Sequence, residues 1–229
     1  MLKPFADEIW IADGTHVSVA GFHYPTRMAV IRLSSRDLFV WSPTALADDL
    51  RADVNTLGQV RHIVAPNSLH HLFLQDWARA FPDAKLYAPP GLRKKRPDIA
   101  FAADLADQPD PSWAGDIDQV PMRGNLITTE VVLFHRKSGT ALFTDLLQQL
   151  PPTLLSGWRA VVAKLDLMVG AEPQVPHKFR LAFTDRSAAR AALTRIMAWP
   201  TQRVLLAHGT PIEQGGQAYL RRAFAWLRP

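Results

Sequence analysis

The amino-acid sequence predicts an α/β fold in a single domain that spans residues 1–229. The chain is 48% hydrophobic and 21% charged, which suits one sizeable globular core, and it shows no repeat or linker-like segment. Between residues 60 and 89, the apolar runs "VRHIVA" and "KLYAPP" flank "HLFLQDWARAFP", in which apolar residues recur at helical spacing. A strand, a helix and a strand in this order predict a parallel sheet with a right-handed crossover.

Strands and a helix are predicted ahead of this unit. "EIWIADG", residues 8–14, has the composition of a strand. Residues 27–43 contain two β-rich runs separated by "SSRD", which indicates a hairpin. "DDLRADVNTLG" predicts a short helix that ends at Gly58.

The second half of the chain begins with a segment of weak periodicity. Residues 91–123 are rich in Pro, Asp and Arg, so we expect connecting segments with a short strand near "DQVPM". "TEVVLFHRKSGTALFTD" predicts two strands around the turn "RKSG". Residues 185–199 predict a helix capped by Asp185, and "RVLLA" and "GQAYLRRAFAWL" predict a last strand and helix.

Residues 153–170 form an amphipathic helical stretch for which three roles are open. A core helix is the expected one. The stretch could instead cover a site as a lid, or form a homo-oligomer interface through Leu154, Leu155, Trp158 and Val162.

Composition limits the possible functions. The chain has no cysteine, which excludes disulfides and thiolate metal sites and leaves His, Asp and Glu as metal ligands. The N-terminal residues lack a basic region before an apolar core, and no long apolar run follows, so we expect no secretory signal, no membrane span and a cytoplasmic location. Residues 177–229 carry nine Lys or Arg against two Asp or Glu. We interpret these as solvated arginines rather than a nucleic-acid surface, because no basic motif is interleaved with aromatic residues.

Potential metal ligands follow three of the predicted buried strands. "RHIVA" runs into a loop that ends in His70 and His71, "TALFT" is followed by Asp145, and "RVLLA" by His208. Sites form at the C-terminal edge of such strands, and imidazole with carboxylate suits zinc, iron or manganese. Each residue alone could equally be a loop residue or a cap, but together they favour a site.

Several segments resemble a known family. "APNSLHHLF", "YAPPGLRKKRPD", "EVVLFHRKSGTALFTDLL" and "AHGTPI", with the order of strands, are similar to metallo-β-lactamase-fold proteins. More narrowly, they resemble the uncharacterised bacterial DUF4336 subgroup of that superfamily. The resemblance implies an αββα sandwich, in which two mixed sheets pack together and helices cover their outer faces.

The resemblance also implies which ligands have changed. The superfamily's metal loop reads His-x-His-x-Asp-His, and here Pro66 and Ser68 replace its first two histidines. A further family histidine, in a Gly-His turn, corresponds to Asn125. None of these three side chains offers an imidazole or a carboxylate, so the first of the family's two metal sites should be lost.

The second family site maps onto good ligands at all four positions. They are His70, in place of the family's Asp, and His71, Asp145 and His208. The resemblance therefore implies one divalent metal, either a closed structural zinc or a five- or six-coordinate iron or manganese that leaves room for water. Asp145 is the candidate catalytic residue, and the candidates for contacts to a ligand or substrate are Asn67, Ser68, Asn125 and Glu130.

Two functions remain open at this point. One is a metal-dependent hydrolase of an ester, thioester, amide or phosphoester, in which Asp145 holds the metal and accepts a proton from water. The other is a non-catalytic relative that keeps the fold, has a structural metal or none, and binds a small ligand or partner. Surviving ligands favour the first, and the missing histidines favour the second.

Overall fold

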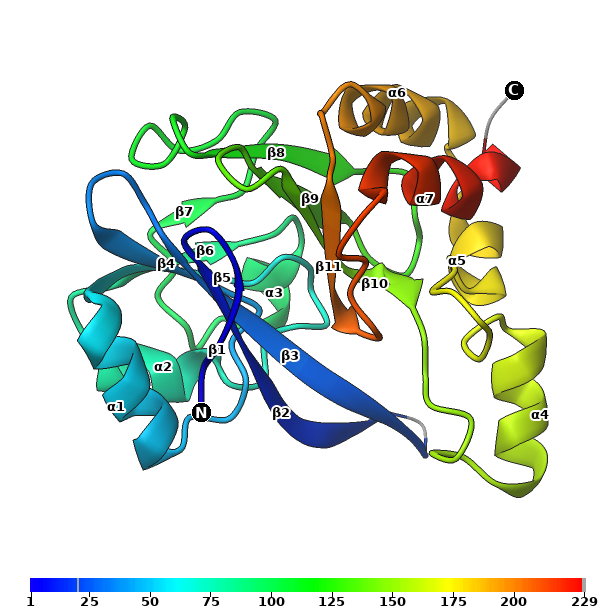
Figure 1. Ribbon diagram of the computed structural model, residues 1–229, viewed down its shortest axis with the longest axis horizontal. Helices are drawn as coiled ribbons and strands as arrows, with labels where there is room; N and C mark the ends of the chain where they lie inside the picture. Colours follow the sequence, from blue (N-terminus) through cyan, green and yellow to red (C-terminus); the bar gives the residue numbers. More distant parts are fainter. Residues whose placement is uncertain (20, 228–229) are drawn as a thin grey trace.

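Two β-sheets pack face to face in the computed structural model, which describes residues 1–19 and 21–227 (Figure 1). The first sheet follows chain order: β1 (Lys3–Ala6), β2 (Ile9–Val19), β3 (Phe22–Arg32), β4 (Asp37–Trp41), β5 (Gln59–Val64), β6 (Lys85–Ala88) and β7 (Ala103–Asp104). The pairs β1–β2, β2–β3 and β3–β4 are antiparallel, and the pairs β4–β5, β5–β6 and β6–β7 are parallel. The second sheet has the order β11 (Arg203–His208), β10 (Thr140–Gln148), β9 (Glu130–His135) and β8 (Ile117–Met122). The second sheet is mixed as well, because β10 and β11 are parallel and its other pairs are antiparallel.

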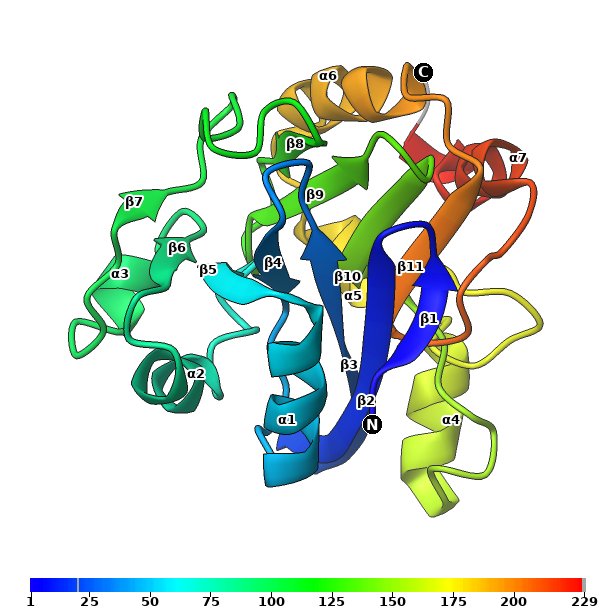
Figure 2. The ribbon, with the colours of Figure 1, turned by 60° about the vertical axis from the view of Figure 1, so that its left-hand side comes forward.

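Helices cover the outer face of each sheet. They are α1 (Asp48–Leu57), α2 (Leu74–Ala80), α3 (Leu92–Lys95), α4 (Gly157–Leu165), α5 (His177–Ala182), α6 (Arg186–Met197) and α7 (Gly216–Ala223). Helices α1, α2 and α3 lie on the side of the first sheet, and α5, α6 and α7 on the side of the second (Figure 2). Their buried residues join the apolar clusters of these two sheets. A third apolar cluster fills the space between the sheets. The predicted αββα sandwich is confirmed. Among the described helices, none has the length and apolar character needed to cross a membrane.

Most predicted elements are present. The predicted strand–helix–strand unit is β5, α2 and β6, and its two strands are parallel. The Asp185 side chain caps α6 by accepting a hydrogen bond from the Ala188 amide at 2.9 Å. The short strand near "DQVPM" is β8. The elements β1, α3, β7 and α5 were not predicted, because each has six residues or fewer and shows too little periodicity.

Helix α4 differs from the expected core helix. Ala163 is its buried residue, whereas Trp158, Val161 and Leu165 are 60%, 59% and 69% exposed. The helix lies near the tip of the β2–β3 hairpin, where the Phe22 and Trp158 rings meet edge to face at 6.0 Å (Figure 1). The prediction of a core helix holds in part, because Leu155, Ala163 and Met168 of this stretch are buried in a small apolar cluster while the outer face of the helix is exposed. The lid and interface roles remain predictions.

A fully buried carboxylate shapes the strand that carries Asp145. Strand β10 pairs regularly with β11 as far as Phe143, and its register is irregular from there to Gln148. In this bulge the amides of Thr144, Asp145 and Leu146 donate to the Glu130 carboxylate at 2.8, 2.8 and 3.0 Å. Glu130, a candidate for contacts to a ligand or substrate, is 0% exposed and binds backbone amides instead. Its carboxylate takes the place of a neighbouring strand for these three amides.

Two histidines are buried away from this edge. His62 on β5 is 5% exposed and lies against Tyr87 and Trp113, and His135 is 1% exposed and bonds Ser138 Oγ through Nδ1 at 2.8 Å. Burial lowers the pKa of each imidazole below its ordinary value. Both rings are therefore neutral in the folded protein at neutral pH.

We expect the free energy of unfolding to fall as the pH drops below about 6.5, the pKa of histidine in an unfolded chain. Below that pH His62 and His135 become protonated in the unfolded chain but stay neutral in the folded protein, so acid favours unfolding. Urea unfolding from pH 7.5 to 5 should show this decline, and His62→Gln should make it shallower. If the free energy of unfolding of His62→Gln fell as steeply with pH as that of the wild type, His62 would not contribute to the pH dependence.

Glu130→Gln should lower the free energy of unfolding by about 1–3 kcal/mol, because an NH₂ group replaces an acceptor that faces buried amides. Glu213→Gln makes the same chemical change at an exposed residue. It should alter stability by less than about 0.5 kcal/mol. Urea denaturation of the metal-free proteins measures both values. Equal stability of the two variants would mean that the Glu130 hydrogen bonds do not support the bulge.

Candidate metal site

The candidate ligands lie where the C-terminal ends of strands from both sheets meet. His70 ends the loop after β5, Asp145 lies in the bulge of β10, and His208 is the last residue of β11. The end of β4 contributes Ser42 to the same edge. Three segments that are far apart in the sequence are thereby brought together, as predicted from the strand ends.

Three ligand atoms converge at this edge. His70 Nε2 lies 3.1 Å from Asp145 Oδ2 and 3.1 Å from His208 Nε2. His208 Nε2 lies 3.6 Å from Asp145 Oδ1. All three residues are buried or nearly so, and their ligand atoms lie within 4.8 Å of one another.

These separations fit a metal ion. Ligands at 2.0–2.1 Å in a tetrahedral zinc site are about 3.3 Å apart. Neighbouring ligands of an octahedral ion with bonds of this length are about 3.0 Å apart. The 3.1 Å between the two Nε2 atoms and the 3.1 Å from His70 Nε2 to Asp145 Oδ2 are compatible with both geometries, and His208 Nε2 lies 3.6 Å from the other carboxylate oxygen, Oδ1. This His/Asp/His group could therefore hold one metal ion, and its spacing does not select which metal.

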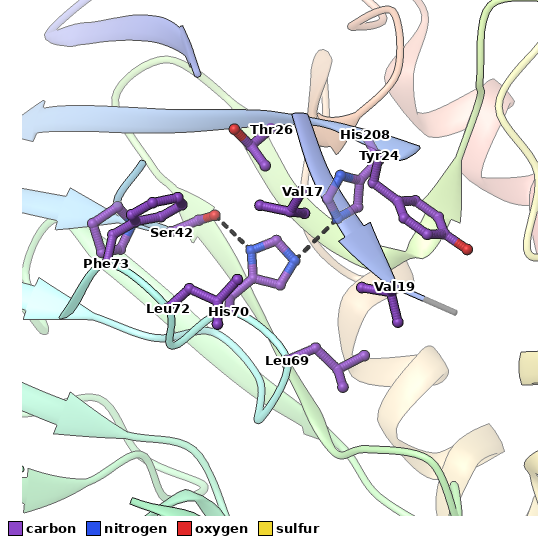
Figure 3. Close-up of a pocket in the computed structure, with 11 residues that line it drawn as sticks. Val17, Val19, Tyr24, Thr26, Ser42, Leu69, His70, Leu72, Phe73 and His208 are labelled. Atoms are coloured by element: carbon purple, nitrogen blue, oxygen red, sulfur yellow. Dashed lines mark hydrogen bonds between the residues drawn. The ribbon is translucent and has the colours of Figure 1, made fainter. Parts of the chain in front are cut away.

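Hydrogen bonds at the second ring nitrogens turn both Nε2 atoms toward the site. His208 Nδ1 donates to the Pro25 carbonyl at 2.6 Å, which leaves Nε2 with a free lone pair. The Ser42 hydroxyl can donate to the Arg27 carbonyl at 3.3 Å, so its oxygen can accept from His70 Nδ1 at 2.7 Å. Figure 3 shows the Ser42 oxygen directed at His70, and the His70 ring directed at His208. This arrangement gives the tautomers that metal binding through Nε2 requires.

The protonation states also suit a cation. Burial lowers the pKa of His208 to about 4, so this imidazole is neutral at pH 7. Burial by itself would raise the pKa of Asp145, but His70, His208 and the Asn67 amide hold it well below its usual range. A neutral imidazole and an ionised carboxylate are the forms in which these side chains bind metals.

Asp145 is fixed by two amides. Asn67 Nδ2 donates to its Oδ2 at 2.7 Å, and Gln148 Nε2 donates to its Oδ1 at 3.1 Å. Asn67 is fully buried, and its own oxygen accepts from the Leu69 amide at 2.8 Å, which shapes the loop that leads to His70. Asn67, a candidate for contacts to a ligand or substrate, thus orients the aspartate and the loop.

His71 lies outside the group of three. Arg96 Nη1 donates to His71 Nδ1 at 3.1 Å and to the His71 carbonyl at 3.2 Å. Burial, together with Lys95 and Arg96, lowers the pKa of His71 to about 4. An imidazole whose Nδ1 accepts from a guanidinium carries its proton on Nε2, so neither nitrogen is available to an ion. The structure brings together three of the four predicted ligands.

The positions of the lost first site make other contacts. Ser68 Oγ bonds Thr128 Oγ1 at 3.0 Å, and the Pro66 carbonyl accepts from the Val131 amide at 2.7 Å. Asn125 Nδ2 donates to the Phe179 carbonyl at 2.9 Å, and its oxygen accepts from the Ile127 amide. These contacts tie the loops to neighbouring segments.

Sequence reasoning missed three groups that hold the site. They are Ser42, Gln148 and the Pro25 carbonyl. Ser42 directly follows the apolar strand "DLFVW", so the strand-end criterion that selected Asp145 and His208 could have found it. A backbone carbonyl such as that of Pro25 carries no side-chain signal at all.

A small pocket opens over the two histidines. Its volume is about 70 Å³, and its lining residues are Val17, Val19, Tyr24, Thr26, Ser42, Pro43, Leu69, His70, Leu72, Phe73 and His208 (Figure 3). A single water needs about 10–15 Å³ by this measure, so the pocket admits several waters or a small organic group. The candidate metal site therefore has access to a ligand.

Known proteins share this architecture. A metallo-β-lactamase from Pontibacter korlensis has a TM-score of 0.66 and 12% identity over 99% of this chain and 98% of that one. A metallo-β-lactamase from Erythrobacter litoralis gives 0.67 and 13% over 99% and 95%. FIM-1 from Pseudomonas aeruginosa, in its mono-zinc form, gives 0.63 and 12% over 100% and 96%. At these identities the likeness shows the metallo-β-lactamase fold alone.

Sequence comparison identifies the family. No curated protein matches the chain. The model of a domain of unknown function, DUF4336, matches residues 6–156, which is more than half of the chain. With the predicted fold and the partial ligand set His70, Asp145 and His208 also in place, the chain belongs to the DUF4336 family and has the metallo-β-lactamase fold.

Proposed function

We propose that this protein is a single-metal hydrolase that acts on an ester, thioester, amide or phosphoester of a small molecule. The observation that carries the proposal is the convergence of His70 Nε2, Asp145 Oδ and His208 Nε2 beneath a pocket. Catalytic zinc sites have three protein ligands and an open position, whereas structural sites are closed by four. A set of three thus favours catalysis over the closed four-ligand site that His71 would complete.

The chain's own residues have distinct tasks in this proposal. A bound divalent ion would supply a lowered pKa for water and polarisation of the scissile carbonyl or phosphoryl oxygen. His70 and His208 hold the ion, while Ser42 and the Pro25 carbonyl fix their rings. Asp145 is a ligand and a weak proton acceptor, because its pKa is low and both its oxygens already accept hydrogen bonds.

The non-catalytic alternative makes a different prediction for the same site. The first-site positions Pro66, Ser68 and Asn125 are engaged elsewhere, so one ion at most is expected here. A ligand-binding relative would hold that ion without hydrolysing any substrate. Metal stoichiometry combined with a hydrolysis screen therefore separates the two functions.

We expect the metal-free protein to bind one equivalent of zinc, manganese or ferrous ion in calorimetric titrations. His208→Ala should weaken this binding by more than the roughly 10–100-fold that loss of an outer hydrogen-bond partner costs, because a direct ligand is removed. His71→Ala is the matched control and should keep one equivalent, since His71 faces Arg96.

Circular dichroism should show that both histidine variants are folded. Equal metal binding by His208→Ala and the wild type would overturn the assigned site. Loss of the ion in His71→Ala would restore the four-ligand set. One bound equivalent without turnover of any ester, thioester, amide or phosphoester would support the non-catalytic alternative.

Ser42 should act through its hydroxyl group. Its φ is +52°, a left-handed conformation that is strained for serine, so Ser42→Ala and Ser42→Gly separate strain from chemistry. Both variants lack the oxygen that accepts from His70 Nδ1, and only glycine relieves the strain. We expect each to lower zinc affinity about 10–100-fold, measured by competition with a chelating dye. Wild-type affinity in Ser42→Gly would show that the hydroxyl does not orient His70.

A further inference from the structure

The pocket over the two histidines presents no charged side chain to a ligand beyond the candidate metal ligands. Among the described residues that line it, none is Lys, Arg, Asp or Glu, and most are aliphatic or aromatic. Val19 and Leu72 stand at its rim with 57% and 55% of their surfaces exposed, and Leu69 with 38%. Figure 3 shows Val17, Leu69 and Leu72 around the His70 ring.

The polar atoms of the lining residues are directed elsewhere. Thr26 Oγ1 donates to the Thr15 carbonyl at 2.8 Å. The Tyr24 hydroxyl bonds Met168 Sδ at 3.7 Å and Lys178 Nζ at 3.3 Å, and Figure 3 shows it pointing away from the two histidines. Ser42 Oγ is held by His70. Apart from the two histidine rings, the side chains therefore present a mainly apolar surface to a ligand in this pocket.

Most cations on neighbouring segments already have partners; Lys95 has no ion pair among the described residues and donates to the Ser68 carbonyl at 2.9 Å. Lys178, which stacks on Tyr24, pairs with Asp166 at 3.1 Å. Arg27, next to Thr26 in the chain, pairs with Asp13 at 2.8 Å. Arg96, behind His71, pairs with Asp98 at 2.6 Å. Apart from a bound ion itself, a phosphate or a terminal carboxylate in this pocket would find no charged side chain among the described lining residues to replace its lost hydration, which is costly.

We infer that this pocket receives the uncharged, apolar acyl group of a carboxylic ester, thioester or amide, with the scissile carbonyl above His70, Asp145 and His208. The inference rests on the proposed function and narrows its four substrate classes. The volume of about 70 Å³ holds roughly five to seven water-sized groups, which corresponds to an acyl chain of about four to six carbons.

The reaction is a hydrolysis that needs no other reactant. The oxygen of water forms a bond to the acyl carbon, and the carbon–oxygen, carbon–sulfur or carbon–nitrogen bond breaks with its electron pair going to the leaving group. One proton of the water ends on the alcohol, thiol or amine, and the other is released from the carboxylic acid product. No oxidant, reductant or acceptor molecule enters the balance.

Chain length is the first test. Zinc-loaded protein is assayed with p-nitrophenyl acetate, butyrate, hexanoate and decanoate, and the rate of the Asp145→Asn variant is subtracted. We expect kcat/KM to rise about fourfold for each buried methylene up to hexanoate, then to level off. A flat profile, or a maximum at acetate, would overturn the inference and leave the proposed hydrolase intact.

Charge is the second test. The p-nitrophenyl monoester of adipic acid has the same leaving group and six-carbon chain as the hexanoate but ends in a carboxylate. The hexanoate should have the higher kcat/KM. Leu72→Arg should reduce the ratio of the two kcat/KM values roughly fivefold, since the new guanidinium can pair with the carboxylate of the adipate ester. Leu181→Arg should leave this ratio unchanged, because Leu181 is 78% exposed and does not line the pocket. Preference of the wild type for the adipate ester would contradict the inference.

A binding measurement separates failure of the inference from failure of the proposed function. Hexanohydroxamic acid and the monohydroxamate of adipic acid offer the same metal-binding group on a neutral and a charged chain. Tighter binding of the neutral compound by the zinc-loaded protein, with no hydrolysis of any ester, would refute the hydrolase and retain the ligand class. If hexanohydroxamic acid bound no more tightly than the adipic acid monohydroxamate, the preference for uncharged acyl groups would be refuted, whether or not the protein hydrolyses esters.

Discussion

The carboxylate of Glu130 is the constraint on which the site depends. It lies fully buried between β9 and β10 and takes the amides of three consecutive residues that would otherwise lack a partner. Burial and the nearby Asp145 charge both raise its pKa, while the amide donors oppose this. Three donors around one acceptor-only group indicate an ionised carboxylate, since a protonated one would present a hydrogen to a ring of N–H groups. The bulge that this carboxylate stabilises places Asp145 at the sheet edge.

Two negative groups can lie close together here because amides separate them. Asn67 Nδ2 donates to Asp145 Oδ2 at 2.7 Å and lies 3.4 Å from Glu130 Oε2. Each carboxylate therefore has its own donors, and Asp145 faces the two imidazoles. Without a cation, two unprotonated Nε2 atoms 3.1 Å apart beside a carboxylate repel one another. The network thus favours either a bound ion or a proton shared among these three groups.

The sequence predicted most of the fold because its strands are long apolar runs with clear turn residues, as in "TEVVLFHRKSGTALFTD". It predicted the meeting of His70, Asp145 and His208 because strand ends of a layered fold share an edge. The burial of Glu130 could not be read from the sequence, because a hairpin start is usually exposed and the irregular pairing of β10 depends on tertiary contacts. His71 was included on the strength of the family pattern. Its orientation toward Arg96 follows from the loop after β6, which pattern matching does not describe.

Replacement of the family's aspartate by His70 changes the electrostatics of the surviving set. Two neutral imidazoles and one carboxylate carry a single negative charge, so a dication held there keeps a net charge of +1. With a second carboxylate at position 70 the same set would neutralise the ion completely. Retained positive charge beneath an apolar pocket strengthens the attraction for a neutral carbonyl oxygen, because an apolar lining screens the charge less than bulk water does. A set of two imidazoles and one carboxylate is therefore compatible with a Lewis-acid site, and Ser42 holds one of these imidazoles in place.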